Sequence, residues 1–537
     1  MINIENLSVA FGDTEAVKNV NIELAKGEIL GVVGESGSGK SVTALTLMGL
    51  EAEDADITSG RVIFDGVVLA EAGRAKDRAL YRRYQGERMS MIFQEPMTSL
   101  NPTKRVGIQV EEMLRLHTDL TGAERRARVL ESFAAVGLRD GESLYDCYPH
   151  QLSGGMRQRV MIAMAVILHP DLIIADEPTT ALDVTIQNQI VALLREINEK
   201  EKNAMLFITH DLNLARRICH RVAVMKDGRV VEIGPTEEIF ANPREEYTKK
   251  LIQAVPSRIK RERGGTVNGK QGENRTVPVV EVHDLNVYYR EGANSLLGSG
   301  FFRRRKKRRV VFDADFKLYQ GEVLGLVGES GCGKSSLSKA ILGMNKDIEG
   351  KVSHFSARPQ MIFQDPYSSL NPCKTVGWLL EEPLRAAGRL DKSLRMSKED
   401  MRAAACDMLR RIGLDESYLH RTPSQLSGGQ RQRISIGQAL ITRPGLVIAD
   451  EPVSALDVTL QAQIMELMRR LQEEMGVAYL FISHDINVVY RMSDRIMVMK
   501  DGRIIEQGRT EDVFANPREE YTKLLLRESE WSNRKCE

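Results

Sequence analysis

The chain has 537 residues, 42% of them hydrophobic, and this length predicts two to four globular domains rather than one core. A net charge of +1 and six scattered cysteines without a Cys-x-x-Cys pair argue against nucleic-acid binding, a disulfide framework and a zinc site. No apolar run approaches the roughly 18 residues that span a bilayer, and the chain does not open with a signal peptide, so we expect a cytoplasmic protein that reaches a membrane only through partners.

The first distinctive stretch is a glycine-rich loop between an apolar strand at 29–33 and a predicted helix at 42–50. It reads Gly-Glu-Ser-Gly-Ser-Gly-Lys-Ser from Gly34 to Ser41, and strand, loop and helix in this order are typical of a phosphate-binding loop. The glycines let backbone N–H groups turn toward phosphate oxygens, and the helix directs its positive end to the same anion. Lys40 adds a mobile cation, and the Ser41 hydroxyl suits Mg²⁺. We predict a nucleoside triphosphate site here.

Further along, an apolar strand starts at Leu172 and ends in two carboxylates, Asp176 and Glu177. Adjacent side chains of a strand point to opposite faces, so the two acids should have different roles. Asp176 suits Mg²⁺ coordination through water, and Glu177 suits the base that polarises an attacking water. An exposed acidic turn is the alternative for one copy alone. His210 closes the next strand, either as a packed residue or as a contact to the γ-phosphate.

The second half of the chain repeats the first. A second loop runs from Gly328 to Ser335, and the set Ser153, Asp176, His210 and Asn242 recurs with identical spacing as Ser427, Asp450, His484 and Asn516. Even the string Asn-Pro-Arg-Glu-Glu-Tyr-Thr occurs twice, at 242–248 and 516–522. Two chance copies in matching contexts are not credible. We predict a fused tandem with a first domain at 1–255, a flexible polar linker at 256–278 and a second domain at 279–537.

The two halves also differ. The span from Lys334 to Gln364 is shorter than the span from Lys40 to Gln94, so the second half lacks most of a strand-turn-strand candidate that the first half has there. It carries instead a basic run at 303–309, interpreted either as a solvated loop or as a contact to anionic lipid or an acidic membrane subunit.

A cysteine marks a further difference, because Cys332 stands where the first loop has Ser38. A thiol near a helix N-terminus should have a lowered pKa and react readily when the site is empty. We therefore predict alkylation of Cys332 that Mg-ATP prevents.

Strands alternate with helices in both halves. Helix-rich stretches at 106–138 and 376–414 follow Gln94 and Gln364. This order predicts an α/β fold with a mostly parallel sheet, covered on both faces, and an inserted helical subdomain. A Leu-Ser-Gly-Gly stretch at 152–155 precedes a predicted helix, and a second such stretch at 426–429 precedes another.

Together the phosphate loops, the Asp-Glu strands and the Leu-Ser-Gly-Gly stretches resemble the nucleotide-binding domains of ABC ATPases. The resemblance implies tandem P-loop domains, each with an antiparallel arm, that pair head to tail, so that the signature serine of one caps the ATP of the other. By position, it assigns catalysis to Gln94, Glu177, His210, Gln364, Glu451 and His484. It assigns Mg²⁺ to Ser41, Gln94, Asp176, Ser335, Gln364 and Asp450.

By position, the resemblance assigns ATP to three groups of residues. In the first half these are Phe11, Gly34, Ser36, Gly37, Gly39, Lys40, Ser41 and Val42. In the second half they are Tyr289, Gly328, Ser330, Gly331, Gly333, Lys334, Ser335 and Ser336. The signature residues are Ser153, Gly155 and Met156 with Ser427, Gly429 and Gln430, where Met156 replaces the usual glutamine. Phe11 could equally be a core residue, and Tyr288 competes with Tyr289 for stacking on adenine.

The segments Gln94 to Pro102 and Gln364 to Pro372, both with Ser-Leu-Asn-Pro, resemble the ATPases of dipeptide, oligopeptide and nickel importers. The fused double form resembles those that serve microcin C-type peptide or glutathione uptake. The resemblance implies two transmembrane permease subunits that dock near the glutamine loops, an extracytoplasmic solute-binding protein, and a peripheral position on the cytoplasmic face of the inner membrane. Many single-unit relatives hold an iron–sulfur centre in a cysteine cluster. Neither 255–278 nor the C-terminus, with only Cys536, has one, so we expect none.

Two other readings remain. An importer ATPase for nickel, an opine or a sugar would share most of these motifs, although sugar-importer tandems lack Ser-Leu-Asn-Pro. Tandem ATPases that act on ribosomes carry a long charged helical linker, which this sequence lacks, and DNA-repair relatives carry zinc motifs or long coiled coils.

Overall fold

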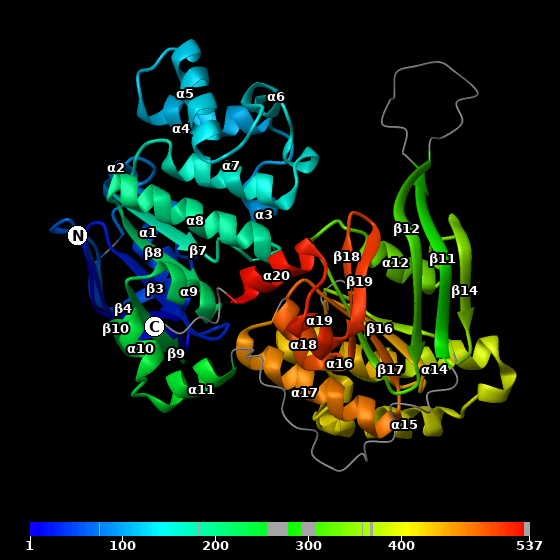
Figure 1. The fold of residues 1–537 in the computed structure, drawn as a ribbon. Helices are drawn as coiled ribbons and strands as arrows, with labels where there is room; N and C mark the ends of the chain where they lie inside the picture. Colours follow the sequence, from blue (N-terminus) through cyan, green and yellow to red (C-terminus); the bar gives the residue numbers. More distant parts are fainter. Residues whose placement is uncertain are drawn as a thin grey trace. The chain divides into compact units, whose positions relative to one another are not determined.

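The structure is a computed structural model that describes residues 1–74, 76–180, 182–254, 278–290, 307–356, 358–365, 369–454 and 456–530. The chain forms two compact units that divide near residue 255, coloured blue to green and green to red in Figure 1. The predicted linker at 256–278 lies outside the described residues except for Pro278, which belongs instead to the first strand of the second unit.

The core of the first unit is a six-stranded sheet in the order β10-β9-β3-β8-β7-β6. The strands are β3 (Ile29–Val33), β6 (Met89–Ile92), β7 (Leu172–Asp176), β8 (Ala204–Thr209), β9 (Arg221–Lys226) and β10 (Arg229–Pro235). All neighbours are parallel except β10, which is antiparallel to β9. Every residue of β3, β7 and β8 is buried, as expected of parallel strands covered on both faces.

Residues of β3 alternate between two cores. Ile29 and Val33 pack with the helical subdomain, and Leu30 and Val32 pack with the arm. The arm is an antiparallel sheet in the order β2-β1-β4-β5. Its strands are β1 (Ile2–Phe11), β2 (Thr14–Leu24), β4 (Ala55–Phe64) and β5 (Val67–Glu71). The predicted mostly parallel sheet and antiparallel arm are confirmed.

Helices surround this sheet. They are α1 (Lys40–Met48), α2 (Arg78–Tyr84), α3 (Pro96–Ser99), α4 (Val106–His117), α5 (Gly122–Ala135), α6 (Gly141–Tyr145), α7 (Gly154–Val166), α8 (Val184–Glu201), α9 (Leu212–Ile218), α10 (Thr236–Ala241) and α11 (Glu246–Ala254). The inserted helical subdomain comprises α4, α5 and α6, which gather at one end of the unit in Figure 1. The helix after the phosphate loop begins at Lys40, two residues before its predicted start.

The second unit repeats this plan with a smaller arm. Its core sheet has the order β15-β16-β17-β13-β18-β19 and its arm the order β12-β11-β14. The strands are β11 (Pro278–Arg290), β12 (Lys307–Tyr319), β13 (Val323–Val327), β14 (Ile348–His354), β15 (Gln360–Ile362), β16 (Leu446–Asp450), β17 (Ala478–Ser483), β18 (Arg495–Lys500) and β19 (Arg503–Arg509). The helices are α12 (Lys334–Ile341), α14 (Val376–Leu390), α15 (Lys398–Arg411), α16 (Gly428–Leu440), α17 (Val458–Met475), α18 (Ile486–Met492), α19 (Thr510–Ala515) and α20 (Glu520–Glu530).

The basic run is not wholly a loop. Residues 303–306 lie outside the described part, but Lys307, Arg308 and Arg309 form the start of β12 and pair with β11. Lys307 forms an ion pair with Asp347 at 3.1 Å, and Arg309 pairs with Asp313. The interpretation of these three residues as a solvated loop is therefore wrong, because strand pairing engages their backbone. None of the described helices combines the length and the hydrophobicity that a membrane span requires.

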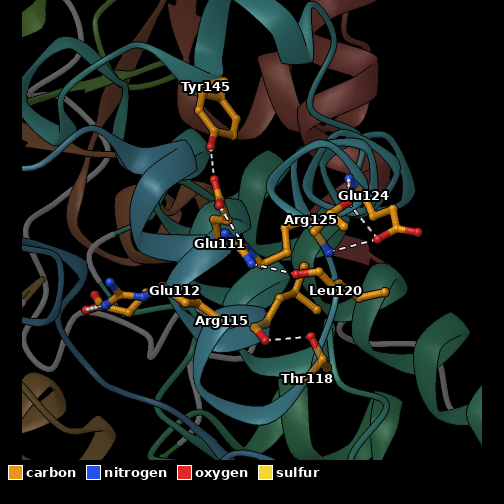
Figure 2. Close-up of polar contacts among 10 residues, drawn as sticks. Glu111, Glu112, Arg115, Thr118, Leu120, Glu124, Arg125 and Tyr145 are labelled. Carbon is orange, nitrogen blue, oxygen red and sulfur yellow. Dashed lines mark hydrogen bonds and ion pairs between the residues drawn. The ribbon is translucent and has the colours of Figure 1, made fainter.

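A partly buried polar network ties the helical subdomain of the first unit together (Figure 2). The Glu111 carboxylate on α4 accepts a hydrogen bond from Tyr145 of α6 and one of 2.9 Å from Arg125 Nε of α5. Arg125 also donates to the Leu120 carbonyl at 2.6 Å. Burial alone would raise the pKa of Glu111, but the bonds from Tyr145 and Arg125 outweigh it and lower that pKa.

We expect Glu111→Gln to lower the free energy of unfolding by about 1–3 kcal/mol at neutral pH, because a hydrogen-bonded carboxylate is lost. A carboxylate with a depressed folded pKa stabilises the fold above its unfolded pKa and stops doing so as the pH falls through its folded pKa. The difference between variant and wild type should therefore shrink below about pH 4.5, the value of an unperturbed Glu. Urea denaturation of both proteins at several pH values measures this.

The matched control is Glu112→Gln on the same helix. Glu112 pairs with Lys104 at 3.4 Å and with Arg115 at 3.1 Å near the surface. Exposed pairs of this kind contribute less than about 1 kcal/mol, so this variant should be nearly neutral. Equal losses in both variants would contradict the assigned role of Glu111.

Candidate active sites

Both phosphate loops follow the carboxyl end of a central strand, and the lysine of each loop hydrogen-bonds to backbone carbonyls of the same loop. Lys40 Nζ donates to the carbonyls of Gly34 and Glu35 at 2.8 Å each. Lys334 Nζ makes the equivalent bonds to Gly328 at 2.7 Å and Glu329 at 2.8 Å. Both lysines are buried, and burial lowers the pKa of Lys40. Each ammonium thus lies against its own loop, within reach of a bound phosphate.

Glycine is required at the first position of each loop because of close packing. A Cβ at Gly34 would lie 2.2 Å from the carbonyl oxygen of Met225, and a Cβ at Gly328 would lie 2.2 Å from that of Met499. Helices α1 and α12 begin after Gly39 and Gly333, whose φ angles are 96° and 109° and which supply no side-chain cap. The first N–H groups of both helices therefore suit an anionic ligand, as predicted for these loops.

A hydroxyl and a carboxylate meet next to each loop. Ser41 Oγ donates to Asp176 Oδ1 at 3.1 Å, and in the second unit Ser335 favours the charged form of Asp450. Burial raises the pKa of Asp176 to about 6 and also raises that of Asp450. Paired oxygen ligands with an incompletely compensated buried carboxylate fit Mg²⁺, which prefers oxygen donors and keeps several waters. Gln94 and Gln364, which we also assigned to the metal, contact the neighbouring glutamate instead of this pair.

Glu177 lies at the centre of a second cluster in the first unit. Its Oε2 accepts hydrogen bonds from Gln94 Nε2 and Thr180 Oγ1, both at 2.9 Å, and lies 3.2 Å from His210 Nδ1. Burial disfavours the charge, but the bonds from His210 and Thr180 outweigh it and lower the pKa of Glu177. Burial likewise opposes protonation of His210, and the Glu177 carboxylate nevertheless raises its pKa. The cluster therefore holds an ionised glutamate.

In the part of the second unit that the structure describes, this cluster recurs with one side-chain donor fewer. Glu451 Oε2 accepts a hydrogen bond from Gln364 Nε2 at 3.0 Å and lies 3.1 Å from His484 Nδ1. Burial again opposes ionisation, and His484 outweighs it to lower the pKa of Glu451. Ser454, at the position of Thr180, donates to the backbone carbonyl of Glu451 at 3.1 Å rather than to its carboxylate.

Two features of these clusters were not predicted. The glutamates do not continue the strand, because Glu177 and Glu451 have left-handed φ angles of 46° and 48°. Their separation from the aspartates therefore results from a turn out of the strand and not from strand alternation alone. Thr180 was missed entirely, since its only sequence signal was a hydroxyl residue three positions after the glutamate, which is common in turns.

The signature stretches cap the helices that follow them. Ser153 accepts a hydrogen bond from the Met156 N–H at 3.4 Å, and Ser427 accepts one from the Gln430 N–H at 3.3 Å. The Gln430 side-chain oxygen in turn accepts a hydrogen bond from the Ser427 N–H at 3.0 Å. This bond completes a capping box, which Met156 cannot form. A Cβ at Gly155 would lie 2.8 Å from Ile186, and one at Gly429 would lie 3.0 Å from Leu460. These glycines allow α7 and α16 to approach the next helix closely.

The other side chains predicted to contact nucleotide lie on the arm of each unit and on the helix that follows each phosphate loop. Val42 and Ser336 are half-buried in the first turn of α1 and α12. Phe11 ends β1 half-buried. Tyr289 on β11 is 40% exposed, whereas the hydroxyl of Tyr288 donates to Glu349 at 2.6 Å. The role of either tyrosine in stacking on a base stays a prediction.

The predicted lowering of the Cys332 thiol pKa is wrong. The side chain is buried, with Sγ 4.0 Å from Lys334 Nζ, and burial raises the pKa of the thiol despite that cation. The helix N-terminus does not compensate for the loss of water around the sulfur.

We therefore expect Cys332 to resist iodoacetamide in the folded chain at neutral pH, with or without Mg-ATP, because the reactive thiolate is suppressed. Cys373, which is exposed, should be alkylated under the same conditions and serves as the internal control. Mass spectrometry of the tryptic peptides reads out both sites. Rapid labelling of Cys332 that Mg-ATP prevents would restore the original expectation.

The family described as ABC transporter matches residues 17–180 and 311–454, and the oligopeptide/dipeptide transporter C-terminal region matches 231–279 and 505–531. A peptidoglycan transport ATP-binding protein, YejF, of Agrobacterium fabrum is 41% identical over 98% of this chain and 96% of its own. A glutathione import ATP-binding protein, GsiA, of Pectobacterium atrosepticum is 42% identical over 98% of this chain and 89% of its own.

Among solved structures, the chain resembles one in the complex of archaeal ribosomal stalk protein aP1 and ribosome recycling factor aABCE1. The TM-score is 0.59 and the identity 20%, over 93% of this chain and 89% of that chain, a likeness that concerns the fold alone. The family matches cover the phosphate loops and both Asp-Glu strands, which are also the residues that the structure brings together. The chain therefore belongs to the ABC transporter ATPases, with two nucleotide-binding domains in one polypeptide.

Proposed function

We propose that this chain is the ATP-hydrolysing subunit of an importer for peptides or peptide-like solutes. The observation that carries the proposal is the repeated arrangement in both units of a phosphate loop, a Ser–Asp pair and a Gln–Glu–His cluster. Relatives more than 40% identical over 98% of the chain are named for glutathione import and peptidoglycan transport. The matched C-terminal region is named for oligopeptide and dipeptide transporters.

In the proposed mechanism each loop binds the phosphates through its N–H groups, and Lys40 or Lys334 neutralises part of their charge. Ser41 and Asp176, or Ser335 and Asp450, would hold Mg²⁺, which would supply positive charge to stabilise the negative charge of the phosphates. Among the described residues, the side-chain donors to Glu177 reach Oε2, so Oε1 is the oxygen that accepts a hydrogen bond from the attacking water. His210 keeps the carboxylate ionised and oriented. Glu451 and His484 act in the same way in the second unit.

The pairing of the two domains, residues 1–255 and 279–537, is part of the proposal and follows from the family resemblance. Each ATP would be completed by the signature of the other domain. One site joins Lys40, Ser41, Gln94, Asp176, Glu177 and His210 to Ser427, Gly429 and Gln430. The other joins Lys334, Ser335, Gln364, Asp450, Glu451 and His484 to Ser153, Gly155 and Met156.

The implied partners are two transmembrane permease subunits, which would dock near Gln94 and Gln364, and an extracytoplasmic solute-binding protein. The chain would then sit on the cytoplasmic face of the inner membrane through these partners. We propose ATP and Mg²⁺ as its cofactors and no iron–sulfur cluster, because the regions that hold the cluster in single-unit relatives lack a group of cysteines. No nucleic acid is among the proposed partners.

An importer for another solute is the second candidate, because this subunit does not bind the solute itself. The fold likeness to a ribosome recycling factor does not favour a ribosomal role, since it concerns the fold alone at 20% identity. The match to the oligopeptide/dipeptide C-terminal region in both units favours the importer instead.

The test is to purify the chain with its membrane subunits and binding protein and to identify the bound solute by mass spectrometry. We expect a peptide or a peptide-like compound, and we expect the loaded binding protein to stimulate ATP hydrolysis by the assembled complex. A metal ion or a sugar as the only solute would move the chain to the second candidate. Failure to associate with any permease would contradict the importer assignment.

A further inference from the structure

The repeated string Asn-Pro-Arg-Glu-Glu-Tyr-Thr has no place in the mechanism described so far. It leads into α11 in the first unit and α20 in the second, the last helix that the structure describes in each. Thr248 and Thr522, its last residues, are almost completely buried. Both copies lie inside the matched oligopeptide/dipeptide C-terminal region. Retention of the whole string at equal places in both units calls for a shared physical role.

In both units the tyrosine of this string reaches the phosphate loop. The Tyr247 hydroxyl accepts a hydrogen bond from the Glu35 N–H at 3.3 Å, and the Tyr521 hydroxyl accepts one from the Glu329 N–H at 3.1 Å. Glu35 and Glu329 are the second residues of the two loops. The tyrosine and its partner are 212 positions apart in the first unit and 192 in the second, and each unit makes the contact independently.

The tyrosine rings are themselves held in place. Lys226 Nζ lies 5.0 Å from the centre of the Tyr247 ring, and Lys500 Nζ lies 4.9 Å from that of Tyr521, within the range of a cation–π interaction. These lysines end β9 and β18, the strands whose following turns pack against the loops. The ring is therefore fixed between its own helix and the core sheet.

A glutamate on the edge strand anchors the two residues of the string that directly precede the helix. Glu232 on β10 accepts hydrogen bonds from the N–H groups of Arg244 at 2.8 Å and Glu245 at 3.3 Å. In the second unit Glu506 on β19 accepts them from Arg518 at 2.9 Å and Glu519 at 3.2 Å. A carboxylate at this place satisfies N–H groups just before the helix and favours its positive end. The helix is thus attached to the sheet at one end and to the phosphate loop through the tyrosine.

We propose that the C-terminal helix of each unit holds the phosphate loop in its nucleotide-binding conformation, with Tyr247 and Tyr521 as positioning residues that set the affinity for ATP. A loop that already has the binding conformation loses less conformational entropy when phosphate binds. Without the hydroxyl the loop samples other conformations, and the apparent dissociation constant rises by the inverse of the competent fraction. Bound nucleotide restores the conformation, so turnover at saturation is preserved. This inference rests on the assignment of both loops as ATP sites.

The test is the double variant Tyr247→Phe/Tyr521→Phe in the full chain assembled with its membrane subunits. We expect KM for Mg-ATP to rise about fivefold, roughly the effect of one lost hydrogen bond, while kcat changes less than about twofold. Hydrogen exchange should become faster in the loops at 34–39 and 328–333 without nucleotide and return to the wild-type rate with Mg-ADP. Each single variant should affect the loop of its own unit alone.

Tyr84→Phe is the matched control, because Tyr84 packs against Phe64 in the arm and its ring is 5.5 Å from that partner. It should leave KM and loop exchange unchanged. Glu232→Gln/Glu506→Gln is the second variant, which loosens the helix start and keeps the tyrosines. It should raise KM in the same direction, and it carries the test if the tyrosine variant unfolds.

Unchanged KM and unchanged loop exchange in the folded tyrosine variant would overturn the inference. A fall in kcat as large as the expected rise in KM, with KM itself unchanged, would also overturn it, because that result would place the tyrosines in the chemical step. The double variant Lys40→Ala/Lys334→Ala tests separately whether the two loops are the ATP sites. If the lysine variant still binds Mg-ATP at wild-type affinity, the loops are not the ATP sites. If it loses binding, a normal tyrosine variant contradicts only the present inference.

Discussion

Replacing Glu177 and Glu451 together by glutamine is expected to reduce ATP hydrolysis by the assembled transporter about 100-fold or more, as for loss of a general base. Gln keeps the shape and the hydrogen bonds from the neighbouring side chains but has no charge to polarise water. Binding should survive, because the carboxylates lie outside both phosphate loops. The double variant should therefore retain ATP, which nucleotide extraction after gel filtration would reveal.

Each single substitution, Glu177→Gln or Glu451→Gln, should remove more than half of the activity if the sites are coupled. Glu199→Gln on the exposed face of α8 is the matched surface control and should be silent, since its pair with Arg195 is solvent-exposed. Full turnover in one single variant would contradict two equivalent sites. In that case we expect the silent glutamate to be Glu451, whose site combines the shortened arm with the Met156 signature. Ser454 donates to the backbone carbonyl of Glu451, whereas Thr180 donates to the carboxylate of Glu177.

The double variant Asp176→Asn/Asp450→Asn should separate catalysis from stability. Asparagine keeps an oxygen that can accept the bond from Ser41 at position 176 but weakens Mg²⁺ binding at both positions, so hydrolysis should fall about 100-fold, the usual cost of losing one electrostatic stabiliser of the transition state. Both aspartates are almost fully buried, and burial raises their pKa values, which means that the charged form is unfavourable without a cation. Without metal the variant should therefore melt about 2–4 °C higher than the wild type, equivalent to about 1 kcal/mol.

An ATPase assay measures the loss of hydrolysis, and thermal unfolding in EDTA and in Mg-ATP measures the change in stability. The wild type should gain stability from Mg-ATP and the variant much less, because binding to the folded state alone raises the melting temperature. Asp54→Asn, an exposed change in the first unit, is the control and should alter neither property. A lower melting temperature of the double aspartate variant in EDTA would show that these carboxylates stabilise the metal-free fold, contrary to the argument from burial.

The sequence alone determined the fold class and most residues of the sites. Phosphate loops, helix caps and strand ends are local backbone features. Residue types such as Gly34, Lys40 and Ser153 indicate them directly, because their φ angles and hydrogen-bonding groups suit these features. Repetition at constant spacing then identified two units, because independent motifs do not recur in register by chance. The antiparallel arm could be expected once the family resemblance was recognised, and the structure confirms it.

Only the tertiary structure decided which groups surround each side chain. The turn that directs Glu177 to Gln94, distant in sequence, depends on packing between β6 and β7, and the Tyr247 contact joins residues 212 positions apart. Burial reversed the expected pKa shift of Cys332, and the fold brought the hydroxyl of Tyr288 to Glu349. The physical reason is the range of the interactions. A sequence pattern reports local backbone geometry and the periodicity of burial, whereas desolvation and hydrogen-bond partners depend on which distant segments the fold brings into contact.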